Sequence, residues 1–493
     1  MPTKLSAATL PSIAETASVP GYDPAELRPG ILHFGVGNFH RAHQAVYLDD
    51  LFATGSDHDW AIVGTGVREA DNAMRSALEG QDWLTTVVEQ EADSSSARVT
   101  AAMIDYVTAA DSAAILEKLA DPAIRIVSMT ITEGGYYIDP SSQRFNPQHP
   151  DIVHDAENMS APRTAFGLIL AGLMNRRAQS QTPFTVMSCD NLPHNGKVTR
   201  DAVVGLARLF DADLADWVEA NVSFPNGMVD RITPATSDRE RRLLAEDFGI
   251  ADASPVFCER FRQWVLEDKF TAGRPALEKV GVQFVPDVTP FETMKIRILN
   301  GGHATIAYPA GLLGIHFVHE AMENPLVRAF LEKLEREEII PAVPPVPDTD
   351  LDAYYQQVAE RFANPKIGDT VRRLALDGSN RQPKFILTSV TDRLAAGQSV
   401  KGLALESALW CRYCFGTTDA GETIEPNDPI WERLTAQAKL ARDNPAAWLE
   451  MVDIYGNLGQ EQRFAEPFAK ALEALWRDGT QKTVTRYLEG TLF

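Results

Sequence analysis

The stretch that decides the fold runs Ile31-Leu32-His33-Phe34-Gly35-Val36-Gly37-Asn38-Phe39-His40-Arg41-Ala42-His43. The short apolar run before Gly35 predicts a buried strand, and the pattern of residues 40–53 predicts a helix. Two glycines at this spacing let the backbone turn tightly and approach a pyrophosphate, with Asn38 and Phe39 beside it. His40 occupies the place of the third glycine of the usual fingerprint. By itself the motif therefore fits a plain structural turn equally well.

Strands and helices alternate after this turn. Apolar runs predict strands at 60–67, 125–131 and 184–188. Helical patterns separate them at 111–119 and 164–175. Such alternation favours a mostly parallel sheet.

The character of the chain changes after about residue 285. Helical periods predominate there, in 292–311, 325–336, 350–361 and 461–476, interrupted by the Pro-rich loop 340–347. The predicted fold class is therefore α/β, a Rossmann-type dinucleotide-binding domain followed by a mainly α-helical domain. We expect the first domain, with an N-terminal arm, to cover residues 1–286 and the second, a substrate and catalytic domain, to cover 287–493.

Composition and charge disfavour several classes of protein. The net charge of -22, from 46 basic and 68 acidic side chains, disfavours a nucleic-acid partner. No apolar stretch has membrane-spanning length and the N-terminus lacks a signal-peptide pattern, so we expect a soluble cytoplasmic protein without a membrane partner. Cys411 and Cys414 form a CxxC in a predicted helix, without a histidine cluster nearby. We expect structural cysteines and no metal site.

The segment Lys295-Ile296-Arg297-Ile298-Leu299-Asn300-Gly301-Gly302-His303 places a lysine, an asparagine and a histidine on a largely apolar helix. On an ideal α-helix His303 lies ~80° and Asn300 ~140° around the axis from Lys295, so all three border one broad face. Hydride removal from an alcohol carbon requires loss of the hydroxyl proton. A lysine can take that proton if desolvation lowers its pKa from ~10.4, and an amide can donate to the developing alkoxide. The alternative is a solvent-exposed lysine, an asparagine cap and a core histidine.

Other polar groups follow predicted strands, where an open α/β sheet places its ligand-binding residues. Asn191 follows the strand at 184–188. Thr132 and Glu133 follow the strand at 125–131. Glu133 suits a place near the cofactor or a gating role, and a solvated loop acid is an equal alternative.

An acid after the second strand is expected to hold the ribose hydroxyls of the cofactor. Glu69 and Asp71 are the candidates, and they favour NAD because they repel a 2′-phosphate. They lie further from the glycines than the usual ~20 residues, so two solvated loop acids remain an alternative. Arg68 points the other way, since an arginine here can accommodate that phosphate.

Together these motifs resemble the polyol-specific long-chain dehydrogenase/reductase family, to which the mannitol 2-dehydrogenases belong. The resemblance rests on residues 35–43, 130–136, 185–196, 224–234, 261–273 and 295–303. Lys295-x-x-x-x-Asn300-x-x-His303 matches the family signature residue for residue. The resemblance implies NAD-dependent, zinc-independent oxidation of a sugar alcohol to a ketose, D-mannitol to D-fructose, and the reverse reduction, by a monomer.

The roles of the family's residues follow from the same resemblance. Lys295 is then the general acid/base, and Asn191 and Asn300 are the amides that stabilise the oxyanion. His303, Arg373, Arg381 and Asp230 are expected to bind substrate. Arg381 stands where the mannitol enzymes carry a lysine, and its larger, permanently charged fork alters recognition at one end of the substrate.

Four alternatives stay open from the sequence. Within the family, a fructuronate or tagaturonate reductase shares the catalytic set, and arabinitol and sorbitol dehydrogenases belong as well. Outside it, the chain is a nucleotide-binding regulatory protein or a metal-dependent dehydrogenase. The segment Leu192-Pro193-His194-Asn195-Gly196 favours the polyol branch over the sugar-acid branch.

Overall fold

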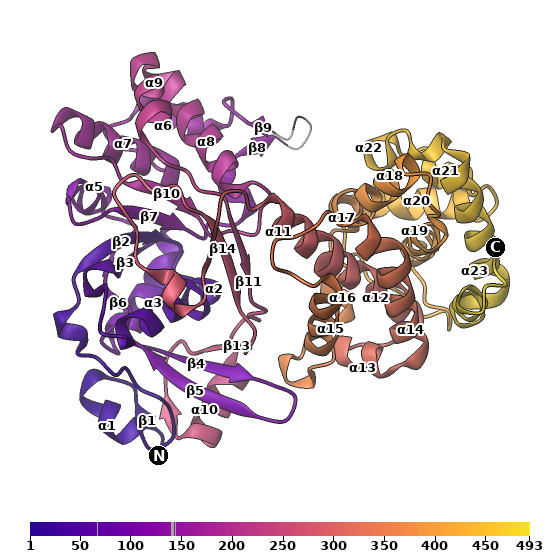
Figure 1. Ribbon diagram of the computed structural model, residues 1–493, viewed down its shortest axis with the longest axis horizontal. Helices are drawn as coiled ribbons and strands as arrows, with labels where there is room; N and C mark the ends of the chain where they lie inside the picture. Colours follow the sequence, from indigo (N-terminus) through magenta and orange to yellow (C-terminus); the bar gives the residue numbers. More distant parts are fainter. Residues whose placement is uncertain (67, 140–141, 143) are drawn as a thin grey trace. The chain divides into compact units, whose positions relative to one another are not determined.

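A computed structural model of the chain describes residues 1–66, 68–139, 142 and 144–493. The chain forms two compact units, Met1–Val288 and Thr289–Phe493. The first, indigo to pink in Figure 1, combines strands and helices, and the second, orange to yellow, is built from helices. The predicted fold class is confirmed, since a Rossmann-like unit with a parallel sheet precedes a largely helical one.

The first unit is organised around a five-stranded sheet in the order β10-β7-β2-β3-β6, and every neighbouring pair is parallel. Its strands are β2 (Pro29–Phe34), β3 (Ala61–Thr65), β6 (Met103–Val107), β7 (Ile126–Met129) and β10 (Thr185–Ser188). The chain runs outward from β2 to β6 and then returns to β7 on the other side of β2. The order of the strands therefore reverses between β2 and β7, which is where open α/β sheets bind ligands at the carboxyl ends of the strands.

The sheet is covered on both faces because its strands are apolar on both sides. Leu32, Val127 and Val186 face one core, which is closed by α5 (Ser112–Ala120), α7 (Ala165–Ala178) and α8 (Asn195–Phe210). Ile31, Ile126 and Met187 face the other core, which is closed by α3 (Gln44–Ala53) and by strand β14 (Gln263–Glu267). Consecutive side chains of one strand thus point to opposite faces of the sheet and pack in different cores.

Smaller sheets complete the first unit. β14 lies between β11 (Gly227–Asp230) and β15 (Gln283–Val285), and β4 (Thr85–Gln90) lies between β5 (Ser95–Thr100) and β13 (Val256–Glu259). The N-terminal residues pack on this unit through β1 (Thr3–Lys4), which pairs with β12 (Ile250–Ala251). Leu5 and Ile13 are buried there.

The predicted strands at 31–34, 125–131 and 184–188 are confirmed by β2, β7 and β10. β3 confirms most of the strand predicted at 60–67, whose last residue, Val67, lies outside the described residues. The helix predicted over 40–53 is two helices, α2 (Asn38–Ala42) and α3, because the backbone breaks at His43 (φ -119°, ψ -84°). β6 and the antiparallel strands were not predicted.

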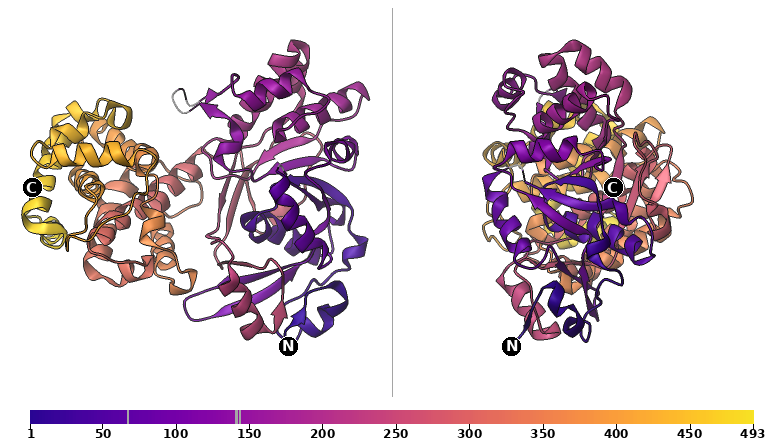
Figure 2. Two further views of the ribbon diagram at one scale, coloured as in Figure 1. Left: turned by 180° about the vertical axis from the view of Figure 1, so that it is seen from behind. Right: turned by 90° about the vertical axis from the view of Figure 1, so that its left-hand side faces the viewer.

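The second unit is helical, as Figure 2 shows from two further sides. Its longer helices are α12 (Gly301–Leu312), α14 (Pro325–Leu334), α15 (Leu351–Phe362), α18 (Leu387–Ala395), α19 (Lys401–Cys414), α20 (Trp431–Ala441) and α23 (Gln462–Leu488). α19 is central, since nearly all its residues are buried. Cys411 and Cys414 lie on it as buried free thiols, as expected for structural cysteines.

Within the described part of the chain, no helix is both long enough and apolar enough to span a bilayer.

Candidate functional site

The glycine turn closes the carboxyl end of β2. Gly35 has φ +90°, and a Cβ there would lie 2.1 Å from the carbonyl oxygen of Thr130. Only glycine fits both the backbone angle and the close approach of the neighbouring strand. Gly37 is different, because a Cβ there would meet nothing nearer than the Gly35 carbonyl at 4.0 Å. Its exposed backbone is open to a ligand.

His40, which stands in place of the third glycine of the usual fingerprint, forms a pair with His33. The ring of His40 stacks on that of His33 with the ring centroids 3.5 Å apart. His33 is held by Ser128 Oγ at 2.8 Å and Thr130 Oγ1 at 3.1 Å. Burial lowers the pKa of His33 to about 3 and holds the pKa of His40 well below its usual range. The pair therefore packs as neutral rings at neutral pH.

The side chains that follow the glycines brace the turn. Asn38 Nδ2 donates to the Pro234 carbonyl at 3.2 Å and to Thr236 Oγ1 at 3.0 Å. Phe39 stacks on His43 with the centroids 4.9 Å apart. Asn38 and Phe39, which are predicted to bind cofactor, thus also fix the turn through their side chains.

The loops after β7 and β10 are joined by one buried carboxylate. Asp190 accepts the backbone N–H groups of Ile131 at 2.9 Å and Thr132 at 3.0 Å, and the Tyr136 hydroxyl at 2.7 Å. Burial raises the pKa of Asp190 above its usual range. Thr132 has φ +62° and ψ 165°, an unfavourable angle pair for a residue with a side chain, so the loop is held in a strained shape.

These contacts bring several predicted residues to one end of the sheet. Thr130, on the loop that carries Thr132 and the exposed Glu133, donates from Oγ1 to the Gly35 carbonyl at 2.6 Å. Asn191 is exposed directly after Asp190. The loops after β2, β7 and β10 therefore lie together at the point where the strand order reverses.

The acids after β3 have different surroundings. Asp71 Oδ2 accepts the backbone N–H of Arg68 at 2.9 Å, and a Cβ on Gly66 would lie 2.4 Å from the Asp71 Cβ. The carboxylate of Asp71 thus helps to close its own turn. Glu69 and Arg68 are exposed. Of the two predicted acids, Glu69 is the more accessible to a ligand.

Asp230 belongs to a different sheet from the residues above. It ends β11, pairs in register with Gln263 of β14 and is buried. Arg231 beside it donates to Ala42 and Glu259 carbonyls and to Glu89.

In the second unit, the predicted catalytic segment is a π-helical turn. This turn is η7 (Lys295–Asn300), and it lies between α11 (Thr289–Met294) and α12. The separation of ~140° expected between Lys295 and Asn300 on an α-helix is therefore wrong, because i→i+5 bonding brings residues five apart to nearly the same face. Lys295 is 6% exposed and Asn300 is half-buried.

His303 lies one turn further along, on α12. Its ring stacks on Phe362 with centroids 4.4 Å apart, and its Nε2 is enclosed without a hydrogen-bond partner among the described residues. Burial, followed by nearby positive charges, holds the pKa of His303 well below its usual range. These charges belong to Arg373, Arg361, Arg381 and Lys295. The imidazole is therefore neutral at neutral pH and can bind a hydroxyl.

The two predicted substrate-binding arginines are already engaged. Arg373, on α16 (Val371–Leu374), binds both carboxylate oxygens of Asp369 through Nε and Nη2. Arg381, on α17 (Gly378–Phe385), donates from Nη1 to the carbonyls of Arg373 at 3.3 Å and Leu374 at 3.2 Å. Arg381 thus braces the end of the helix that carries Arg373.

Sequence analysis missed four residues of these surroundings: Asp190, Arg361, Asp369 and Glu335. Glu335 is fully buried, and a Cβ on Gly302 would lie 3.3 Å from its Oε1. Burial raises the pKa of Glu335 well above its usual range. Asp190 follows a predicted strand, and this position could have indicated a functional residue. The pairing of Asp369 with Arg373 depends on the turn before α16, which the sequence pattern does not reveal.

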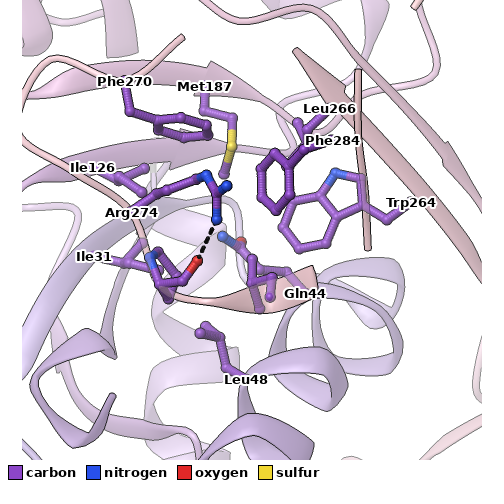
Figure 3. A pocket seen from close by; sticks show the side chains of 12 residues that line it. Ile31, Gln44, Leu48, Ile126, Met187, Trp264, Leu266, Phe270, Arg274 and Phe284 are labelled. Carbon is purple, nitrogen blue, oxygen red and sulfur yellow. Dashed lines mark hydrogen bonds between the residues drawn. The ribbon is translucent and has the colours of Figure 1, made fainter. Parts of the chain in front are cut away.

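A separate small cavity, with a volume of about 10 Å³, lies inside the first unit. Figure 3 shows Ile31, Met187 and Trp264 around it. The guanidinium carbon of Arg274 lies 3.4 Å from the centroid of the Phe284 ring, and Arg274 Nη1 donates to the Pro275 carbonyl. Its described lining contains none of the predicted site residues, and it is almost entirely apolar. We interpret it as a packing gap between sheet and covering strands.

Across the described ranges, no group of three or more histidine, cysteine, aspartate or glutamate side chains is arranged to hold a metal ion.

Two family models together match most of the chain. The family model of the mannitol dehydrogenase Rossmann domain matches residues 29–279, and that of the mannitol dehydrogenase C-terminal domain matches residues 287–476. The chain belongs to the mannitol dehydrogenase family. The predicted resemblance is thereby confirmed.

Individual relatives of the mannitol dehydrogenase family are similar over their full length. A mannitol 2-dehydrogenase of Cereibacter sphaeroides is 62% identical over 470 residues, covering 95% of this chain and 98% of the relative. Pseudomonas fluorescens mannitol 2-dehydrogenase, solved as a ternary complex with NAD and D-mannitol, has a TM-score of 0.87 and 44% identity, covering 99% of this chain and 100% of that one. A substrate-free D-sorbitol dehydrogenase has a TM-score of 0.91 and 36% identity, covering 97% and 100%.

Proposed function

We propose that this protein is an NAD-dependent polyol dehydrogenase that interconverts D-mannitol and D-fructose. The observation that carries the proposal is the π-helical turn with Lys295 and Asn300 at its two ends and His303 one turn beyond. Alcohol oxidation needs a base for the hydroxyl proton and is assisted by an amide that donates to the developing alkoxide. A neutral imidazole can bind a further hydroxyl group. The names of the similar proteins, mannitol 2-dehydrogenases among them, support the choice of substrate.

The glycine turn and its neighbouring loops fit a dinucleotide. Gly35 makes the tight turn at the end of β2, Gly37 leaves its backbone open there, and Thr132 and Glu133 lie on the adjoining loop. Glu69, after β3, suits the ribose hydroxyls. NAD supplies the hydride acceptor in oxidation and, as NADH, the donor in reduction. We propose residues 1–286 as the NAD-binding domain, 287–493 as the substrate domain, and a monomer as the working unit.

The polar side chains then divide the work on the substrate. Lys295 takes the hydroxyl proton during oxidation and returns it during reduction. Asn300 and Asn191 donate amide N–H groups to the oxygen as charge develops on it. His303, Arg373, Arg381 and Asp230 bind or orient the other hydroxyls.

The state of Arg373 supports a neutral substrate over a sugar acid. A carboxylate that loses its water needs a counter-charge, ideally a free bidentate arginine. Asp369 already neutralises the Arg373 guanidinium and occupies two of its donors. The remaining donors suit hydroxyl groups.

The substrate branch is tested by kcat/KM for D-fructose and for D-fructuronate with NADH, measured side by side. The two sugars differ only in the group at carbon 6, so the ratio isolates the cost of a carboxylate. We expect fructose to be preferred. A tenfold preference for fructuronate, about 1.4 kcal/mol of transition-state discrimination, would show a sugar-acid reductase instead.

NAD is expected to be preferred over NADP because Glu69 repels a 2′-phosphate. Glu69→Gln should lower the ratio of kcat/KM for NAD to that for NADP by about tenfold or more. The matched control is Glu117→Gln, which removes an exposed acid from α5. A wild-type enzyme that is faster with NADP would show that Arg68 determines the cofactor.

Activity is expected to be independent of metal, since Lys295 supplies the base and the described residues offer no ligand cluster. Prolonged EDTA treatment followed by desalting should leave the rate of mannitol oxidation unchanged. Loss of activity that added Zn²⁺ restores would refute this part of the proposal.

NADH binding without turnover of any polyol or ketose would instead favour a regulatory protein.

A further inference from the structure

The carboxylate behind Arg373 is not among the groups assigned above to the substrate. Asp369 and Arg373 are four residues apart, and the ion pair is bidentate, Nε to Oδ1 and Nη2 to Oδ2. The Asp369 side chain is only 10% exposed, whereas that of Arg373 is 51% exposed. The acid is thus a buried anchor, and the guanidinium is the accessible partner.

The backbone holds Asp369 in place. Its Oδ1 also accepts the backbone N–H of Thr370 at 2.8 Å, and its carbonyl accepts the N–H of Val318 at 3.0 Å. Val371 N–H donates to the His316 carbonyl at 2.9 Å, so the turn is tied to a second segment on both sides. The carboxylate is therefore fixed in position before substrate binds. Binding then spends no free energy on ordering it.

The charge that Asp369 cancels lies close to the proposed substrate groups. Arg373 is the largest of the charged influences on the pKa of His303. Asp369 occupies one edge of the Arg373 guanidinium and neutralises its charge. The other edge can still bind hydroxyl groups. A substrate carboxylate at that edge would meet a neutralised arginine and the negative charge behind it.

We propose that Asp369 is a specificity-determining residue that makes the site favour neutral polyols and ketoses over sugar acids. It acts by neutralising Arg373, without touching the substrate itself. This inference rests on the proposed function, because it assigns Arg373 to substrate binding.

The test replaces the charge of Asp369 and compares two substrates. Asp369→Asn should raise the ratio of kcat/KM for D-fructuronate to that for D-fructose by at least about tenfold, because the freed guanidinium then pairs with the carboxylate. Asp369→Glu, which retains the charge, should keep a ratio close to that of the wild type. Glu466→Gln removes an exposed acid of α23 and controls for net charge.

The link through Arg373 has its own measurement. In the double variant Asp369→Asn/Arg373→Gln the gain for fructuronate should disappear. Asp369→Ser removes the same charge with a smaller side chain and is a second charge-free variant in case Asp369→Asn does not fold. Melting curves show which of the two variants is folded.

A ratio that stays at the wild-type value in the charge-free variants, or a gain that survives loss of Arg373, would overturn the inference. Failure of the proposed function has a different signature, namely a wild type that turns over neither mannitol nor fructose or that already prefers fructuronate.

Discussion

Lys295→Ala is expected to lower kcat for mannitol oxidation by about 10²–10⁴-fold, the usual contribution of a general base. The proton of the substrate hydroxyl then has no acceptor on the π-helical turn, while the glycine turn is unchanged. The affinity for NADH, measured by fluorescence titration, should therefore stay close to that of the wild type.

The matched control for this variant is Lys470→Ala, which removes an exposed lysine from α23. It should have wild-type turnover. Near-normal turnover in Lys295→Ala would show that another group is the base.

Gly35→Ala is expected to disrupt both the fold around β2 and the binding of cofactor. The positive φ alone costs an alanine about 1–2 kcal/mol, and its Cβ would clash with the Thr130 carbonyl 2.1 Å away. We expect a lower melting temperature and more than about a tenfold loss of NADH affinity, or about 1.4 kcal/mol.

Gly37→Ala is the informative partner of that variant. Gly37 has an extended backbone (φ -90°, ψ -176°) with open space around it, so alanine should leave the melting temperature unchanged. NADH affinity should still fall, because the added methyl occupies the approach of the cofactor. Wild-type NADH affinity in Gly37→Ala would remove this glycine from the cofactor site.

The central sheet was largely predictable because its strands are short, apolar and buried on both faces. Ile31–Phe34 and Ile126–Met129 consist mainly of such residues, and their turn signals follow directly. β6 was not predictable in this way, since Asp105 interrupts its apolar pattern at the edge of the sheet. The antiparallel strands depend on pairing between distant segments, such as β11 with β14, which local patterns do not contain.

The candidate site was predictable in its residue types and less so in its contacts. The spacing of Lys295, Asn300 and His303 stands out against an apolar background. The π-helical turn that brings the first two to one face leaves no periodic signal of its own. Asn38 and Arg381 have the side-chain types expected at a ligand, yet both donate to backbone carbonyls, Asn38 to Pro234 and Arg381 to the end of α16. Such contacts are set by tertiary packing.

The most direct test of the central claim is the oxidation of D-mannitol by the purified wild-type protein with NAD, with NADH formation followed by absorbance and the product identified by chromatography. We predict steady formation of NADH with D-fructose in equal amount, and the reverse reaction with fructose and NADH. No NADH formation from mannitol, or a product other than fructose, would contradict the account.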